Sequence, residues 1–145
     1  MLLSELNQIN ESVQFTPDEQ KRALAQLQPL VDANGEIDLE KFFNKELELS
    51  AGGIDIPLTA YSVKRVNLSQ LYPTQDVIEI KWVQAVLNNQ GRTQGLAFVA
   101  ITDQMTIVDG HHRIVAEIAA GRRTVEVNLT RITFDDDGEM MFTPG

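Results

Sequence analysis

The residues best suited to chemistry lie in one short stretch, Asp109-Gly110-His111-His112-Arg113, which holds both histidines of the chain. This stretch follows an apolar β-type run and precedes an amphipathic run, an order that predicts a strand, a tight turn and a helix. The start of a helix presents backbone N–H groups that lack intrahelical partners, and its dipole favours an anion. Gly110 would let a ligand approach the backbone, and His112 and Arg113 add side-chain donors. The turn therefore predicts a phosphate-binding site.

Each of these candidates also has a simpler interpretation. Successive helical residues lie 100° apart, so His111 and His112 cannot both face one ligand. Arg113 could instead pair with Asp109 or with another carboxylate. Asp109 could be a catalytic acid or base, a magnesium ligand or simply the helix cap. We expect no metal site on the two adjacent histidines, because chelating pairs on a helix are four residues apart.

Composition and charge limit the class of protein. The 145 residues suffice for one domain, and 43% of them are hydrophobic, enough for a core. A net charge of −9 argues against nucleic acid as a partner. Cysteine is absent, which excludes disulfides and Cys-based metal sites. No apolar run approaches the roughly 18 residues of a membrane span, and the N-terminus lacks the pattern of a secretory signal, so we expect a cytoplasmic protein.

The residue pattern changes near positions 50 to 57, which divides the chain into a helical appendage, 1–53, and a domain, 54–145. Thr16-Pro17-Asp18-Glu19 combines a cap, a proline at the first helical position and a capping-box Glu, and predicts a helix from about Pro17 to Leu27. Short helices are also expected within 3–10 and from Asp38. Isolated short helices are marginal in water. We therefore expect the appendage to pack partly on the domain and to leave a face for a partner.

The second part of the chain predicts the element order β-α-β-β-α-β of an α+β domain. The apolar periodicity and the turn residues between the runs define these elements. The expected strands are 60–66, 96–102, 105–108 and 124–133, with a short last strand at 139–142; the expected helices run from about Val77 to Asn88 and from His111 to Ala120, where Gly121 ends the helix.

Residues from about 60 to 133 resemble the ParB/sulfiredoxin superfamily, which implies a small mixed-sheet α+β domain. Pro73-Thr74-Gln75 is similar to the Asn-Pro-x-Gln-x-Arg box of ParB proteins, and 110–116 is similar to their Gly-Glu-Arg-Arg-x-x-Ala box. Asp109-Gly110-His111-His112-Arg113 is closer still to the Asp-Gly-His-x-Arg motif of free serine kinases and of ParB-like domains in phage and toxin proteins. The resemblance implies that Gly110, His111, His112 and Arg113 bind nucleotide phosphates, with Pro73 and Gln75 close to the ligand. It places a donor at His112, which is therefore favoured over His111 as the ligand contact.

Departures from these families narrow the expected activity. His111 stands where sulfiredoxins carry their nucleophilic cysteine, which excludes sulfinic-acid repair. The arginine that ends the first ParB box falls on Val77. The serine kinases use an acidic base near the first box, where Asp76 is the candidate, because the amide of Gln75 cannot take a proton.

Three functions follow from the sequence. The first is an NTPase or phosphotransferase that binds an NTP with Mg²⁺, with Asp109 sharing the magnesium and Asp76 as the base. The second is a ParB-like nuclease, which the acidic charge disfavours. The third is a non-catalytic assembly or virion protein of phage origin, present as a homo-oligomer or in a larger complex, in the host cytoplasm or the virion. The departures at Gln75, Val77 and His111 favour binding or assembly over catalysis.

Overall fold

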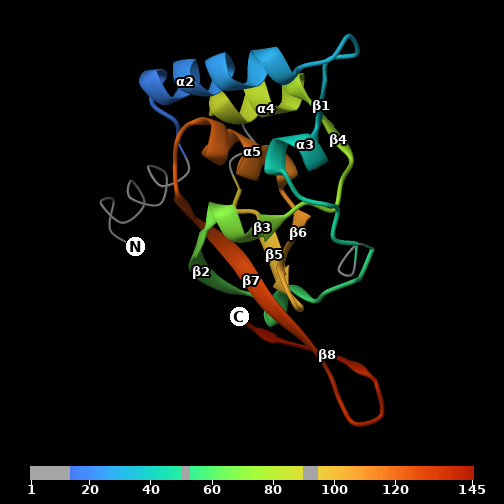
Figure 1. Ribbon diagram of the computed structural model, residues 1–145. Coiled ribbons are helices and arrows are strands. Elements are labelled where there is room, and N and C mark those ends of the chain that lie inside the picture. The colour runs from blue at the N-terminus through green and yellow to red at the C-terminus, as the bar shows by residue number, and fades with distance from the viewer. Residues whose placement is uncertain (1–13, 50–52, 90–94) are drawn as a thin grey trace, which may run out of the picture.

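The chain forms a mixed α/β domain in which the helices lie at one end and the main sheet at the other. The computed structural model describes residues 14–49, 53–89 and 95–145. Helices α2 and α4 form the outermost layer, and α5 lies between them and the sheet (Figure 1). The helices are α2 (Pro17–Leu27), α3 (Leu39–Phe43), α4 (Ile80–Leu87) and α5 (His111–Ala119). The 3₁₀ turns are η1 (Gln28–Leu30), η2 (Leu58–Ala60) and η3 (Leu68–Gln70).

The main sheet has six strands and mixes parallel with antiparallel pairs. Its order is β2-β7-β5-β6-β3, and β8 pairs with the far end of β7. The pairs β5–β7 and β3–β6 are parallel, and the others are antiparallel. The strands are β2 (Ser62–Asn67), β3 (Leu71–Tyr72), β5 (Phe98–Ile101), β6 (Met105–Asp109), β7 (Thr124–Phe134) and β8 (Met140–Pro144); β1 (Glu36–Asp38) and β4 (Val77–Glu79) form a separate antiparallel pair.

Helix α2 begins and ends where its sequence signals predict. The Thr16 hydroxyl accepts a hydrogen bond from the Glu19 N–H at 3.2 Å, and the Glu19 carboxylate accepts from the Thr16 N–H at 3.0 Å. This capping box satisfies two donors that a helix start leaves open. Ala23 and Leu27 are fully buried on the inner face of the helix.

The predicted helix from Val77 to Asn88 is wrong at its start. Residues 77–79 form strand β4, and the helix begins only at Ile80. Ile78 lies opposite Ile37 of β1, and both side chains are buried. Two β-branched residues pack against each other across this pair, so a partner 41 positions earlier decides the local structure. The sequence analysis also missed β1 and the two-residue strand β3.

One hydrophobic core joins the N-terminal helices to α4 and α5. The segment before position 50 contributes Phe15, Ala23, Leu27, Ile37 and Leu39, and the remainder of the cluster is Ile78, Val83, Val86, Leu87, Val115, Ala116, Ala119 and Ala120. The expectation that the appendage packs on the rest of the chain is therefore confirmed for 15–39. The boundary between 1–53 and 54–145 and the face left for a partner stay predictions. The helix expected within 3–10 lies outside the described residues.

The C-terminal part of the chain forms a long hairpin. Strand β7 has 11 residues, and β8 returns along its second half with Phe134 opposite Met140. The ribbon projects from the body of the molecule at the end away from the helices (Figure 1). In the ranges the structure describes, none of the helices is long and apolar enough to cross a bilayer.

Candidate functional site

A hollow of about 380 Å³ opens where strand β6 meets helix α5, at the predicted phosphate turn. Four of the predicted site residues line it: Asp109, Gly110, His112 and Arg113. The rest of its wall comes from α4 and from the segment that leads into β5, through Trp82, Val86, Gly95, Leu96 and Phe98. We call it the α5 hollow.

Gly110 has a packing reason for being glycine. Its backbone is left-handed, with φ +95° and ψ 28°, and a Cβ there would lie 2.8 Å from both Cα and Cβ of Ala97. A side chain would therefore be strained and would overlap the neighbouring segment. This packing requirement does not test the expected close approach of a ligand to the backbone, which stays a prediction, and Gly110 lines the hollow.

The start of α5 is not capped by a side chain. Gly110 is the cap residue, and its carbonyl accepts the first helical hydrogen bond from Ile114 at 3.1 Å. Asp109 lies one residue too early to be the cap; its carboxylate accepts from the Gly110 N–H at 2.9 Å and is otherwise exposed. The first-turn N–H groups of His111 and His112 thus precede the helical ladder and are available to a bound anion.

His111 points into the protein, away from the hollow. Its side chain is buried, and Nε2 accepts a hydrogen bond from the Thr74 N–H at 3.0 Å. The Thr74 hydroxyl, 2.9 Å from the Ile107 carbonyl, donates to it. Burial and, to a smaller extent, the charge of the neighbouring His112 together lower the pKa of His111 to about 4. His111 is therefore neutral with its proton on Nδ1, and it holds the 73–75 loop against α5 instead of donating to a phosphate as expected.

His112 is the histidine that lines the hollow, and it is the one that the resemblance favoured. It is half-buried at the wall of the hollow. Burial lowers its pKa below the usual 6.5, and the carboxylates of Asp109 and Glu79 oppose that shift without reversing it. At neutral pH the ring therefore offers one N–H donor and one acceptor nitrogen.

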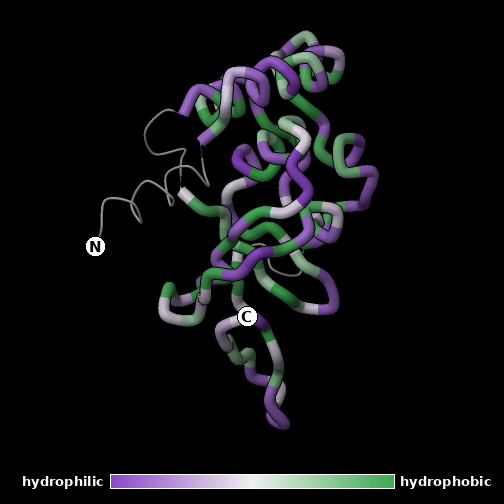
Figure 2. Tube along the Cα trace, turned by 90° about the vertical axis from the view of Figure 1, so that its left-hand side faces the viewer, coloured by the Kyte–Doolittle hydropathy of each residue, from purple (hydrophilic) through white to green (hydrophobic). Residues whose placement is uncertain are grey.

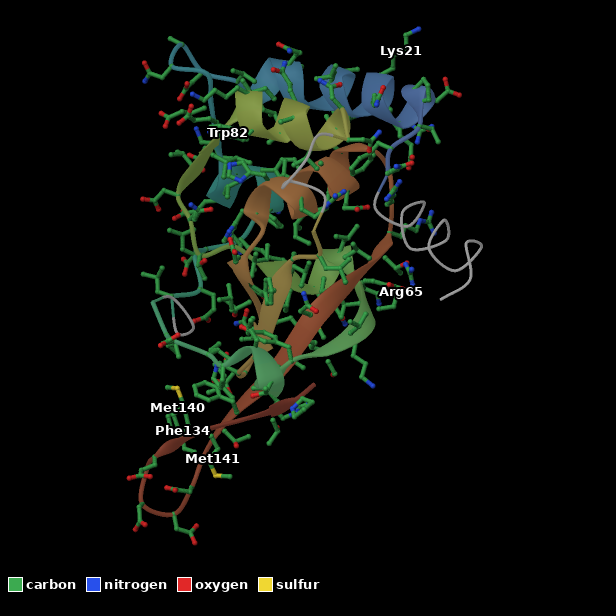
Figure 3. All side chains as sticks on the ribbon, turned by 180° about the vertical axis from the view of Figure 1, so that it is seen from behind. Lys21, Arg65, Trp82, Phe134, Met140 and Met141 are labelled. Carbon is green, nitrogen blue, oxygen red and sulfur yellow. The ribbon has the colours of Figure 1, made fainter. Side chains whose placement is uncertain are left out.

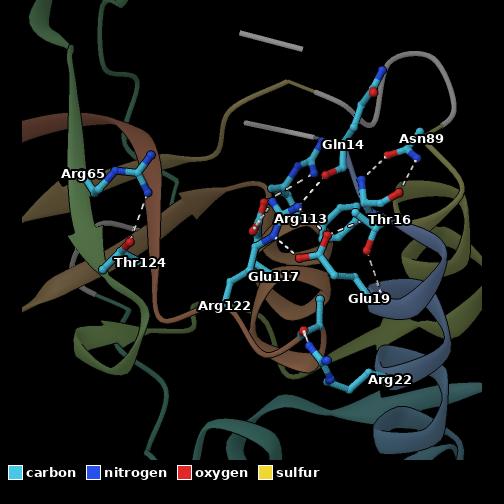
Figure 4. A network of polar contacts seen from close by, with 12 residues as sticks. Gln14, Thr16, Glu19, Arg22, Arg65, Asn89, Arg113, Glu117, Arg122 and Thr124 are labelled. Carbon is cyan, nitrogen blue, oxygen red and sulfur yellow. Dashed lines mark hydrogen bonds and ion pairs between the residues drawn. The ribbon is translucent and has the colours of Figure 1, made fainter. Parts of the chain in front are cut away.

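The guanidinium of Arg113 belongs to a buried network behind the hollow (Figure 4). Its side chain is 3% exposed, lies 3.6 Å from the Glu117 carboxylate and stacks 5.3 Å from the Phe15 ring. Glu117 is 1% exposed and also accepts from Arg122 Nη1 at 2.9 Å. This placement differs from the expected side-chain contact with phosphate, because the charge of Arg113 compensates a buried carboxylate.

Arg122 connects the first and the last helices of the described chain. Its Nε and Nη2 donate to the two oxygens of Glu19 at 2.7 and 3.0 Å, a bidentate pair (Figure 4). This hydrogen bonding holds the pKa of the Glu19 carboxyl at about 2, whereas burial raises the pKa of Glu117. Arg122 thus links α2 to the end of α5 across 103 positions of sequence.

The other predicted residues lie outside the α5 hollow. Pro73 is buried, and its carbonyl accepts from the Glu48 N–H at 2.9 Å. Gln75 and Asp76 are exposed in the connection between β3 and β4. The Asp76 carbonyl accepts from the Leu39 N–H at 2.8 Å. The structure thus does not bring Asp76 and Asp109 together in one hollow.

Sequence reasoning missed three residues that shape this region. Thr74 had no distinctive signal, because its role depends on a histidine 37 positions away. Glu117 is four residues after Arg113, a spacing that indicates a helical ion pair and could have been used. Trp82 belongs to no recognised motif; its side chain is 49% exposed and lines the α5 hollow.

Comparison with known proteins assigns no family to this chain. No family model matches it, and neither a curated protein nor a solved structure does.

Proposed function

We propose that the α5 hollow binds a nucleotide, with its phosphates at the start of α5 and its base against Trp82. The observation that carries this proposal is that a helix N-terminus, His112 and an exposed tryptophan share one hollow. Trp82 lies on the outer side of the molecule, on α4 (Figure 3). A volume of about 380 Å³ is in the range that holds drug-sized ligands, roughly 300–1,000 Å³.

The phosphate end of the ligand would meet three kinds of group. The first-turn N–H groups and the helix dipole favour an anion. The neutral ring of His112 can donate one hydrogen bond to it. The exposed carboxylate of Asp109 repels a bare phosphate, so a bound cation is needed to offset these two negative charges.

Magnesium is the cation that such a site would share with its ligand. Among the residues that the structure describes, no three His, Asp or Glu side chains gather to hold a metal by themselves. Mg²⁺ is commonly bound by one or two carboxylates together with substrate phosphates. Asp109 fits that arrangement, because its carboxylate stands beside the proposed phosphate position. The bound ion would neutralise phosphate charge.

The base end of the ligand would find an apolar wall. Val86, Leu96 and Phe98 line the hollow together with Trp82. Stacking of one base on an aromatic side chain contributes about 1–3 kcal/mol and tolerates any base. The wall offers few polar side chains for base-edge hydrogen bonds, so we expect little discrimination between nucleobases.

Membership of the ParB/sulfiredoxin superfamily is part of this proposal. Its support is that the two boxes of the resemblance are adjacent, joined by the hydrogen bond between Thr74 and His111. We propose binding without turnover as the main activity. The candidate base Asp76 lies outside the hollow, and a buried neutral His111 occupies the position of the family's reactive residue.

A thermal-shift screen tests the ligand class. The full chain is heated with ATP, CTP, GTP, ADP or inorganic phosphate, each with and without Mg²⁺. A ligand at 100 times its dissociation constant stabilises the fold by about 2.7 kcal/mol, which is a clear shift for a domain of this size. If none of these ligands moves the melting temperature, the proposal is wrong.

Two variants locate the site by calorimetric titration of the best ligand. Trp82→Ala should weaken binding by about 1–3 kcal/mol, the range for one stacked base. Phe134→Ala is the matched control, because it removes an aromatic side chain that is 63% exposed but lies outside the hollow. His112→Ala should cost about 0.5–1.5 kcal/mol, as for one neutral hydrogen bond. Equal effects of Trp82→Ala and Phe134→Ala would place the ligand elsewhere.

A further inference from the structure

The end of the β7–β8 hairpin extends past the rest of the sheet. Strand β5 pairs with β7 only at Asn128–Arg131, so beyond this point the chain is a two-stranded ribbon. We call 132–142 the arm. It projects at the end of the molecule opposite the outer helices (Figure 1).

The arm carries an apolar face that is covered at its base and exposed at its end. Ile132 pairs with Phe142, and both pack in a small cluster with Ile54 and Ile56. Two residues further out, Phe134 pairs with Met140 on the same face, and these side chains are 63% and 39% exposed (Figure 3). An isolated two-stranded ribbon is marginal in water. Phe134 and Met140 therefore continue the covered face of Ile132 and Phe142 into solvent.

Acidic residues surround this exposed pair. The turn that connects the strands contains Asp135, Asp136, Asp137 and Glu139 and is strongly hydrophilic (Figure 2). The Asp135 carboxylate accepts from the N–H groups of Asp137 and Glu139 at 2.9 and 2.8 Å and so shapes the turn. The other three acidic side chains are exposed. The end of the arm is thus both apolar and negatively charged.

A second hollow has the complementary character. It measures about 510 Å³, and we call it the basic hollow; its lining is Phe42, Phe43, Lys45, Asn67, Leu68, Ser69, Ile118, Arg122 and Arg123. Apolar side chains of α3, η3 and α5 form its floor, and three cations but no acidic residue line it. This local sign is opposite to the net charge of −9 for the whole chain.

We propose that the arm of one copy of this chain seats in the basic hollow of a second copy. Phe134 and Met140 would bury their side chains on the apolar floor, and the acidic turn would lie near Arg123 and Lys45. Arg123 is exposed, and the partly buried Lys45 amine lies 4.4 Å from the centroid of the Tyr72 ring. Buried apolar surface would supply the affinity, and the charges would supply specificity.

The two surfaces cannot meet within one molecule. Arg123 immediately precedes β7, and Phe134 is its last residue, so they lie at opposite ends of one 11-residue strand. At about 3.3 Å per residue this strand separates them by roughly 30 Å. The contact must therefore form between copies, either repeated head to tail or exchanged reciprocally in a two-fold dimer.

Sedimentation velocity of the full chain over a micromolar concentration series tests the contact. The wild type should associate more as its concentration rises. The arm variant Phe134→Ser/Met140→Ser and the hollow variant Arg123→Glu should each raise the dissociation constant at least about tenfold. Val63→Ser is the matched control, because it removes an apolar side chain that is 55% exposed on β2, outside both surfaces, and should change nothing.

Mixing the two variants is the sharper test. The arm variant keeps an intact basic hollow, and the hollow variant keeps an intact arm, so together they should form a 1:1 complex that does not grow further. A wild type that stays monomeric throughout the series overturns the proposal, and so does a mixture that forms no complex. An arm variant that associates as the wild type does also overturns it. No nucleotide is needed, so this result is independent of the proposed function.

Discussion

Replacing Glu19 by glutamine should reveal how much the link between α2 and α5 stabilises the fold. Glutamine keeps the size of the side chain and an oxygen for the capping box, but it loses the charge that pairs with Arg122. The folded-state pKa of Glu19 is about 2, against an ordinary value of 4.5. That difference of about 2.5 units corresponds to at most about 3.4 kcal/mol, at 1.36 kcal/mol per unit.

The stabilisation should depend on pH in a definite direction. Because the folded-state pKa of Glu19 is lowered, its contribution is complete above pH 4.5 and is lost as the pH falls towards 2. The difference in unfolding free energy between the wild type and Glu19→Gln should thus shrink from about 3.4 kcal/mol at pH 7 to about 1.4 kcal/mol at pH 3. The charge of Glu19 also raises the pKa of Glu117, so its removal relieves the buried carboxylate and makes these figures upper limits.

Urea unfolding at a series of pH values measures this difference. Asp18→Asn is the control, because it removes a carboxylate from the same first turn of α2, and its pair with the helix dipole contributes only about 0.3–1 kcal/mol. A Glu19→Gln penalty that equals that of Asp18→Asn, or one that stays constant from pH 7 to pH 3, would refute the assigned role of the Glu19–Arg122 pair.

Two further predictions concern the β6–α5 junction. Gly110→Ala should destabilise the fold by more than about 2 kcal/mol, because it adds overlap with Ala97 to the cost of a left-handed backbone. Gly138→Ala is the control: with φ +81° and open space around it, it should show only the backbone cost of about 1–2 kcal/mol. Equal melting temperatures for the two variants would exclude the overlap. An NMR titration of the two histidines should give a pKa of about 4 for His111 and a higher value, still below 6.5, for His112. Two coincident pKa values near 6.5 would contradict the buried, hydrogen-bonded His111.

Local signals predicted the elements whose ends are set by neighbouring residues. Thr16, Pro17 and Glu19 fix the start of α2 through contacts within four positions, and Gly121 follows the end of α5 with φ +90°. Strand β7 alternates clearly between buried and more exposed residues, and both strands of the β7–β8 hairpin were located within two residues. Strand β4 could not be found in this way, because Val77-Ile78-Glu79 continues a helical pattern and becomes a strand only through β1.

The sequence predicted the backbone of the candidate site and the position of His112, but not the directions of Arg113 and Trp82. Strand, turn and helix around Gly110 follow from periodicity, and the helical angle allowed only one of the two histidines to face a ligand; the family resemblance favoured His112, which lines the hollow. The direction of Arg113 depends on Glu117 and Phe15, and the latter comes from a distant segment. Trp82 enters the hollow because α4 packs beside α5, a tertiary arrangement that no local pattern encodes.

The pair between Glu19 and Arg122 also bears on how the chain folds during synthesis. The two residues are 103 positions apart, and ribosomes add about 5–20 residues each second, so Glu19 is added roughly 5–20 s before Arg122. Until α4 and then α5 have been synthesised, the inner face of α2, with Ala23 and Leu27, lacks the helices that cover it in the folded chain. We expect the helical layer to form only late in translation, and chaperones that bind exposed apolar segments to contact the nascent chain at α2.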